Sequence, residues 1–295
     1  MKDVIFKGCG TAIVTPFTED GEVDFETLRK LIDFQILEGV DSIIVCGTTG
    51  ESATLSTEEK KEIIKFAVQI ARKRIPIIAG TGSNNTKTSI ELSKYAQKVG
   101  ADGLLLVSPY YNKTTQAGLI KHYSLIAQSV AIPIIIYNVP SRTGLNIEPA
   151  TCLELSKIKN IVAIKEASSN ISQVAQIAYL CKDNLHIYSG NDDQVIPILA
   201  LGGIGVISVL SNLYPKYVHD MVYSYLDGNL PKALNMQLNS LDLIHSLFCE
   251  VNPIPVKYAM AHFGLNCGKT RLPLVEPSDE SKEKILNSLK SFQNY

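Results

Sequence analysis

Eight short apolar segments, spaced about 30 residues apart, constrain the fold more than any other feature of the sequence. Most consist of uninterrupted Ile, Val, Leu or Ala, which is typical of strands that are covered on both faces. Longer segments with helical periodicity lie between them, so the pattern predicts repeated strand–helix units. The predicted strands span residues 8–15, 42–45, 76–80, 103–107, 133–137, 162–166, 186–189 and 205–208.

The segment 57–72 shows the helical pattern most clearly. Acidic residues occupy its first turn and basic residues its last, which complements the helix dipole. Ser56 is the predicted N-cap of this helix.

Eight such units fit a closed parallel barrel better than an open doubly wound sheet. The open sheet also lacks its dinucleotide-binding fingerprint, because neither GTTGES at Gly47 nor LGGIGV at Leu201 gives GxGxxG after the first strand. From about Leu230 onward the pattern is only helical. We therefore predict an α/β fold, a (β/α)8 TIM barrel over residues 1–229 that forms the catalytic domain, with a small C-terminal helical extension over residues 230–295.

Composition excludes several classes of protein. With 45% hydrophobic residues the chain can bury a large core, and with a net charge of −1 and dispersed basic residues it carries no binding surface for nucleic acid. No apolar run has the length of a signal peptide core or a bilayer span, so we expect a cytoplasmic protein without a membrane partner. The six cysteines are far apart and predicted to be buried thiols, and the five scattered histidines predict no metal site.

In barrels of this kind the reactive groups lie at the carboxyl ends of the strands. Lys165 ends an apolar strand and shares side-chain parity with Ile161 and Ala163. If that face is the barrel interior, loss of water favours the neutral amine, which can attack a ketone. From this segment alone, a surface lysine that pairs with Glu166 is the alternative.

Two more strand ends carry candidate polar groups. Tyr137 is placed to transfer protons, or is a buried tyrosine with its hydroxyl bonded to the backbone. The loop 47–51 offers hydroxyls and backbone N–H groups for a carboxylate or phosphate, or is a tight turn. Arg142 matches a substrate carboxylate, or is exposed to solvent.

Five motifs in order place these residues beside a known family. GTTGE at Gly47, PYYNK at Pro109, YNVPSRTG at Tyr137, IKEAS at Ile164 and NPIPVK at Asn252 together resemble the dihydrodipicolinate synthase family, also called 4-hydroxy-tetrahydrodipicolinate synthases. The resemblance implies a carbon–nitrogen lyase that condenses pyruvate with L-aspartate 4-semialdehyde. This is the first committed step of diaminopimelate and lysine biosynthesis, in a class I aldolase-like barrel without metal or organic cofactor.

The resemblance also implies roles for the catalytic residues. Lys165 forms an imine (Schiff base) with pyruvate, and the iminium acts as an electron sink while the methyl carbon loses a proton. Tyr137, Thr49 and Tyr111 resemble the family's proton-relay triad, in which Tyr111 reaches into the site of the neighbouring subunit. The active unit is then at least a dimer, and the family is usually a dimer of dimers, so we expect a homotetramer.

The substrate-binding residues follow in the same way. Thr48 and Thr49 hold the pyruvate carboxylate, Arg142 holds the carboxylate of the semialdehyde, and the backbone of Gly190 and Ile207 lines the pocket.

Other activities of the superfamily are alternatives. N-acetylneuraminate lyase and 2-keto-3-deoxy-sugar acid aldolases keep the lysine and tyrosine but generally lack the arginine after the proline, so Arg142 favours the synthase. A keto-acid-binding sensor barrel without catalysis is a further alternative. Such a protein would be expected to lose Lys165 or its tyrosine relay, and both are present.

One region departs from part of the family. Enterobacterial and plant members bind lysine in a cleft at the dimer interface through a histidine pair and a glutamate, among other residues. This sequence keeps Asn84 and Tyr110 but has Thr57, Lys60 and Thr88 at those three positions. A cationic ligand loses its carboxylate partner and meets Lys60, so we expect lysine to inhibit weakly or not at all.

Overall fold

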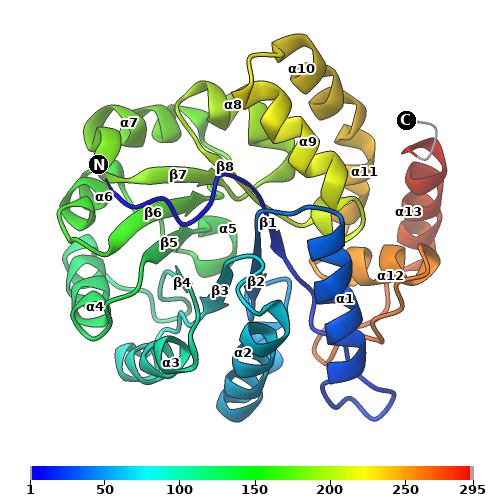
Figure 1. Ribbon diagram of the computed structural model, residues 1–295, viewed down its shortest axis with the longest axis horizontal. Coiled ribbons are helices and arrows are strands. Elements are labelled where there is room, and N and C mark those ends of the chain that lie inside the picture. The colour runs from blue at the N-terminus through cyan, green and yellow to red at the C-terminus, as the bar shows by residue number, and fades with distance from the viewer. Residues whose placement is uncertain (1, 293–295) are drawn as a thin grey trace.

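Eight parallel strands pair in chain order and close into a barrel, with β1 beside β8 (Figure 1). This computed structural model describes residues 2–292 and confirms the predicted TIM barrel. Four of the predicted strand ranges match the observed strands. Three others, β3, β5 and β6, differ from them by one residue at one end or at both, and only β1 differs by more. The strands are β1 (Gly8–Ala12), β2 (Ser42–Val45), β3 (Ile77–Gly80), β4 (Gly103–Val107), β5 (Ile134–Asn138), β6 (Ile161–Glu166), β7 (His186–Ser189) and β8 (Gly205–Ser208).

The first strand is shorter than predicted, because it ends at Ala12 instead of Thr15. Beyond Ala12, the Val14 N–H donates to the side chain of Asn212, and the Thr15 hydroxyl donates to the carbonyl of Gly50. These bonds turn the chain out of the sheet and onto the rim of the barrel.

The helices form a ring around the barrel, and α10 to α13 extend it on one side (Figure 1). The predicted helix 57–72 is confirmed as α2, where Ser56 caps the N-terminus in a reciprocal capping box with Glu59. The helices are α1 (Phe25–Leu37), α2 (Thr57–Ala71), α3 (Thr86–Val99), α4 (Gln116–Gln128), α5 (Pro140–Thr143), α6 (Pro149–Ser156), α7 (Ile171–Cys181), α8 (Val195–Ala200), α9 (Pro215–Leu226), α10 (Leu230–Asn239), α11 (Leu241–Leu247), α12 (Ile254–His262) and α13 (Asp279–Phe292).

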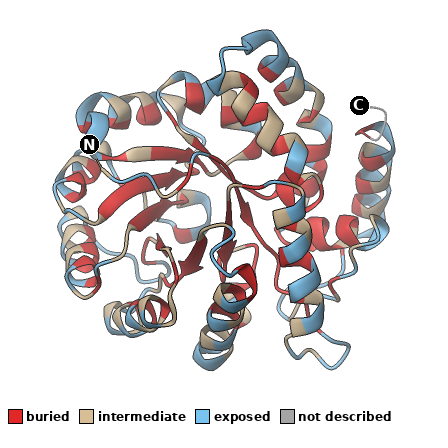
Figure 2. Ribbon diagram, in the orientation of Figure 1, coloured by how far each residue is buried: buried red, intermediate tan, exposed pale blue. Residues whose placement is uncertain are grey.

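Two apolar clusters stabilise the barrel. One lies between the strands and the helices, so the strands are buried while the outer helix faces are exposed (Figure 2). The second is formed by alternate strand residues such as Ile44, Ile78 and Ile135, and fills the interior. The barrel interior is therefore a packed core and not a channel.

In strand β6 the side-chain parity differs from the predicted one. Ile161 packs in the outer cluster, whereas Val162 and Ala163 both belong to the inner one. The pairing with β5 shifts register at this point, so a β-bulge adds one residue to β6. Ile161 therefore does not share a face with Lys165, while Ala163 does.

The C-terminal extension contains four helices, with a non-helical stretch at residues 263–278 between α12 and α13. The division into two domains at residues 229 and 230 stays a prediction. All six cysteines are free thiols, five of them buried. Within residues 2–292, no helix combines the length and apolarity that a bilayer crossing requires.

Candidate active site

A pocket of about 460 Å³ opens at the carboxyl ends of the strands. Residues of the loops after β2, β4 and β5 line this pocket, together with residues next to α12. It is mostly apolar, with a few polar groups, as small-molecule sites usually are. Its polar lining includes Thr48, Tyr111, Tyr137, Arg142 and Asn252.

Lys165 and Tyr137 lie side by side on neighbouring strands, where they are partners in the β5–β6 register. Each is 5% exposed, and the Lys165 Nζ lies 4.4 Å from the centre of the Tyr137 ring. No hydrogen bond or ion pair to the side-chain amine of Lys165 is found within residues 2–292. Tyr137 lines the pocket, and the amine lies beside its ring.

Gly190 leaves room for this amine. A Cβ at Gly190 would lie 3.1 Å from the Cε of Lys165 and 2.7 Å from the Cβ of Ala167. Ile207 contributes to the inner cluster that also contains Tyr137. The two predicted backbone positions therefore border the same interior space as the lysine.

Glu166 does not pair with Lys165, because it points to the other face of β6. Its carboxylate accepts hydrogen bonds from the side chains of Asn138 and Gln173 and from the Ser168 N–H, and burial raises its pKa. The surface-pair alternative for Lys165 is therefore wrong.

Asp192 is a second buried carboxyl near the lysine, and sequence reasoning missed it. It is 3% exposed, and its Oδ2 accepts from the backbone N–H groups of Val209 and Leu210. Burial raises its pKa, while the charge of Lys165 acts in the opposite direction. The carboxyl is thus close enough to Lys165 to interact electrostatically with it.

The loop after β2 is a tight turn, in which the Glu51 N–H donates to the Thr48 carbonyl at 3.0 Å. Thr48 is half-buried and lines the pocket, whereas Thr49 is 2% exposed. The Thr49 Oγ1 accepts a hydrogen bond from the Asn252 Nδ2 at 3.0 Å. The tight-turn alternative is therefore confirmed, and binding of a carboxylate or phosphate by this loop stays a prediction.

Arg142 and Tyr111 lie at the outer edge of the pocket. Arg142 is in α5 and is exposed, and its guanidinium makes no hydrogen bond or ion pair with the described residues 2–292. Tyr111 has a left-handed backbone conformation, with φ at 70°, and its side chain is 87% exposed. In a single chain Tyr111 is therefore largely exposed to solvent.

The residues of the predicted lysine cleft lie around the loop after β3. The Asn84 side chain donates to the Tyr110 carbonyl at 3.3 Å. Thr57 and Lys60 belong to α2, and Thr88 belongs to α3, which packs against α2. Lys60 is half-buried, and this burial lowers its pKa.

Three further residues were missed because their partners are distant in sequence. Lys257 forms an ion pair with Glu51 at 2.7 Å, and both side chains are at most 3% exposed. Asn252 bonds to Thr49 across 203 residues. All three lie within motifs quoted for the resemblance, which was the only signal in the sequence. Among residues 2–292, no group of three or more His, Cys, Asp or Glu side chains could hold a metal ion.

A closed barrel with a buried lysine beside a tyrosine of its strand-end pocket defines a (β/α)8-barrel enzyme with a candidate amine nucleophile. A sequence profile of the Dihydrodipicolinate synthetase family matches residues 5–292, and the chain belongs to that family. The chain is 56% identical to 4-hydroxy-tetrahydrodipicolinate synthase 1 of Clostridium acetobutylicum, covering 98% of both chains. It is 55% identical to the synthase of Acetivibrio thermocellus, covering 99% of both.

A solved structure agrees with these relatives. Dihydrodipicolinate synthase from Aquifex aeolicus superposes with a TM-score of 0.95 at 45% identity, covering 98% of both chains. The comparisons confirm the predicted family and the prediction of a lyase, and they favour the synthase over the alternative activities. They do not test the roles of individual residues.

Proposed function

We propose that this chain condenses pyruvate with L-aspartate 4-semialdehyde, and that Lys165 forms the covalent intermediate. The observation that carries the role of Lys165 is its burial beside Tyr137 without an anionic hydrogen-bond partner in the described chain. The Lys165 amine lies beside a tyrosine that lines the pocket, where it can act as the nucleophile. It attacks the pyruvate carbonyl carbon, and loss of water gives the imine.

The iminium then draws electrons from the pyruvate methyl carbon. That carbon loses a proton, and the resulting enamine attacks the aldehyde carbon of the second substrate. Attack of the substrate's own amine on the imine carbon closes the ring and releases Lys165. No metal ion or organic cofactor takes part in the proposed route.

The polar rim of the pocket binds the two substrate carboxylates. Thr48 and Thr49 bind the pyruvate carboxylate, and the unpaired guanidinium of Arg142 binds that of the semialdehyde in a bidentate pair. Gly190 and Ile207 line the space beside the imine.

Protons pass along Tyr137, Thr49 and Tyr111, and the Tyr111 of each site comes from a second copy of the chain. Two observations support that assignment, the 87% exposure of this tyrosine and its left-handed backbone. No hydrogen bond to its side chain is found within residues 2–292. The active protein is therefore a dimer or a dimer of dimers, and it acts in the cytoplasm.

A coupled assay tests the proposed substrates. Pyruvate is offered with aspartate semialdehyde and, separately, with N-acetylmannosamine, and product formation is followed in each. Turnover with the semialdehyde alone supports the synthase. Turnover with the sugar alone overturns it, and the absence of a borohydride-trapped pyruvyl adduct on the protein rejects the imine route.

Lysine inhibits this protein weakly or not at all. Lys60 and Thr57 in α2 and Thr88 in α3 supply no carboxylate for a cationic ligand. Steady-state assays with increasing lysine are expected to retain most activity through the submillimolar range. Half-inhibition at submillimolar lysine would contradict this proposal.

A further inference from the structure

Asn252 lies between the pocket and the buried threonine of the β2 loop. It is 5% exposed and lines the pocket just before α12. Its Nδ2 donates to the Thr49 Oγ1 at 3.0 Å, and its Oδ1 is buried without a hydrogen-bond partner in the described chain. The amide therefore makes its one side-chain hydrogen bond to Thr49.

This bond has a direction. A threonine hydroxyl has one proton to donate and two lone pairs that accept. Because Asn252 donates, Thr49 uses a lone pair there and keeps its own proton free. No acceptor for that proton is found within residues 2–292.

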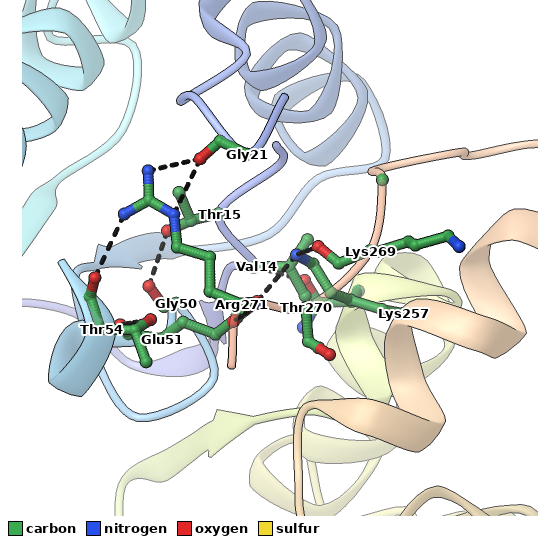
Figure 3. A network of polar contacts seen from close by, with 12 residues as sticks. Val14, Thr15, Gly21, Gly50, Glu51, Thr54, Lys257, Lys269, Thr270 and Arg271 are labelled. Carbon is green, nitrogen blue, oxygen red and sulfur yellow. Dashed lines mark hydrogen bonds and ion pairs between the residues drawn. The ribbon is translucent and has the colours of Figure 1, made fainter. Parts of the chain in front are cut away.

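The backbone that carries Thr49 is held by the same C-terminal extension. Glu51 has a left-handed φ of 53°, which is uncommon for a residue other than glycine. Its carboxylate binds the Lys257 ammonium at 2.7 Å and the Arg271 N–H at 3.0 Å (Figure 3).

Arg271 connects the β2 loop to two further backbone segments. Its guanidinium donates to the carbonyls of Gly21 and Thr54 (Figure 3). The turn is thus fixed from one side by contacts more than 200 residues away in sequence. Thr49 has little freedom to move, so the direction of its hydroxyl depends on Asn252.

We propose that Asn252 is a positioning residue that keeps the Thr49 hydroxyl free to donate its proton. This inference rests on the proposed function, in which Thr49 belongs to the proton relay. Because the Asn252 side chain donates to Thr49, the Thr49 hydroxyl does not donate its own proton to Asn252. Removal of a proton from the methyl carbon of the pyruvate imine is the step that this orientation serves. Tyr137 takes that proton and passes its own to the second lone pair of Thr49, while Thr49 gives its proton to Tyr111.

The test reverses the bond without changing the shape of the side chain. In Asn252→Asp the carboxylate only accepts, so the Thr49 hydroxyl must donate its proton to residue 252. In Asn252→Ala the donor is lost but no acceptor replaces it. Asn235→Asp, on the exposed face of α10, is the matched control for the added charge.

Two steps are measured separately at saturating pyruvate. Borohydride trapping followed by mass spectrometry reports the imine, and exchange of the pyruvate methyl protons in deuterated water, without aldehyde, reports proton removal. We expect Asn252→Asp to form the imine within about twofold of the unaltered protein while exchange falls about 100-fold. In Asn252→Ala the exchange should fall about tenfold. In Asn235→Asp the exchange should be unchanged.

Three results would overturn the inference. These are exchange by Asn252→Asp within twofold of the unaltered protein, a loss in Asn252→Ala as large as in Asn252→Asp, and parallel losses of imine and exchange. The last two would indicate a role in packing. If the unaltered protein forms no adduct and exchanges no protons, the proposed function itself fails.

Discussion

Two lysines in this chain are buried to nearly the same extent, yet their surroundings differ. Lys165 in β6 is 5% exposed and Lys257 in α12 is 4% exposed. Each ammonium nitrogen lies 4.4 Å from the centre of an aromatic ring, that of Tyr137 or of Phe17. Burial and aromatic contact therefore do not distinguish the two.

The difference lies in their anionic partners. Lys257 contacts Glu51 at 2.7 Å and the Lys269 carbonyl at 3.1 Å, whereas Lys165 has no such bond within residues 2–292. A paired buried ammonium stays charged and stabilises structure, since separating it from its partner is costly. An unpaired one at the end of a pocket is available for chemistry. The partner, more than the burial, distinguishes a structural lysine from a reactive one.

The largest expected effect comes from removing Lys165. Lys165→Met should abolish the borohydride adduct and lower kcat/KM by about 10⁴-fold or more, because no other amine is positioned to form the imine. Its free energy of unfolding in urea should be unchanged or higher, because an apolar side chain replaces an unpaired buried amine. The exposed Lys94→Met is the control. Unchanged product formation in Lys165→Met would remove the basis of the comparison.

Lys257→Met should have the opposite profile. It leaves the Glu51 carboxylate buried without its cation, so unfolding in urea should show a loss of about 3–5 kcal/mol. Any adduct formed by the folded fraction should still be on Lys165. The double variant Glu51→Gln with Lys257→Met removes both charges and should recover much of the stability. A single variant as stable as the unaltered protein would mean that the pair contributes nothing.

The fold could be predicted from local patterns because each strand carries its own signal. Apolar runs identified all eight strands, and Ser56 was recognised as a helix cap from its position. The parity error at Ile161 arose because a β-bulge has no marker in the apolar run around it. The early end of β1 depends on Asn212, which lies 198 residues from its partner.

The candidate site divides in the same way. Lys165 and Tyr137 lie near the carboxyl ends of the strands that carry them, so the sequence pattern alone placed them there. Asn252, Glu51 and Lys257 acquire their contacts only when the C-terminal extension packs on the barrel. No local pattern encodes a contact over 200 residues, and the exposed Tyr111 depends on a neighbour outside this chain.

A second ion pair sharpens the comparison through its partial exposure. The His219 Nδ1 lies 2.9 Å from the Asp41 Oδ2, with side-chain exposures of 28% and 16%. The hydrogen bond to Asp41 raises the pKa of His219, burial opposes that shift, and Asp220 and Lys216 act with opposite signs nearby. Tyr223 also donates to Asp41. This pair, unlike that of Lys257, is partly exposed and contains a histidine, whose charge depends on pH.

The sign of the effect follows from proton binding. The folded state binds the His219 proton more tightly than the unfolded state does, so the contribution is complete below the unfolded pKa of about 6.5. It is lost as pH rises through the higher folded pKa. The stability difference between the unaltered protein and His219→Gln should therefore shrink, by about 1 kcal/mol or less, between acidic and alkaline pH. Urea unfolding of both at about pH 5.5 and 8.5 isolates this residue from the other titrating groups, and a constant difference would show that His219 acts by packing alone.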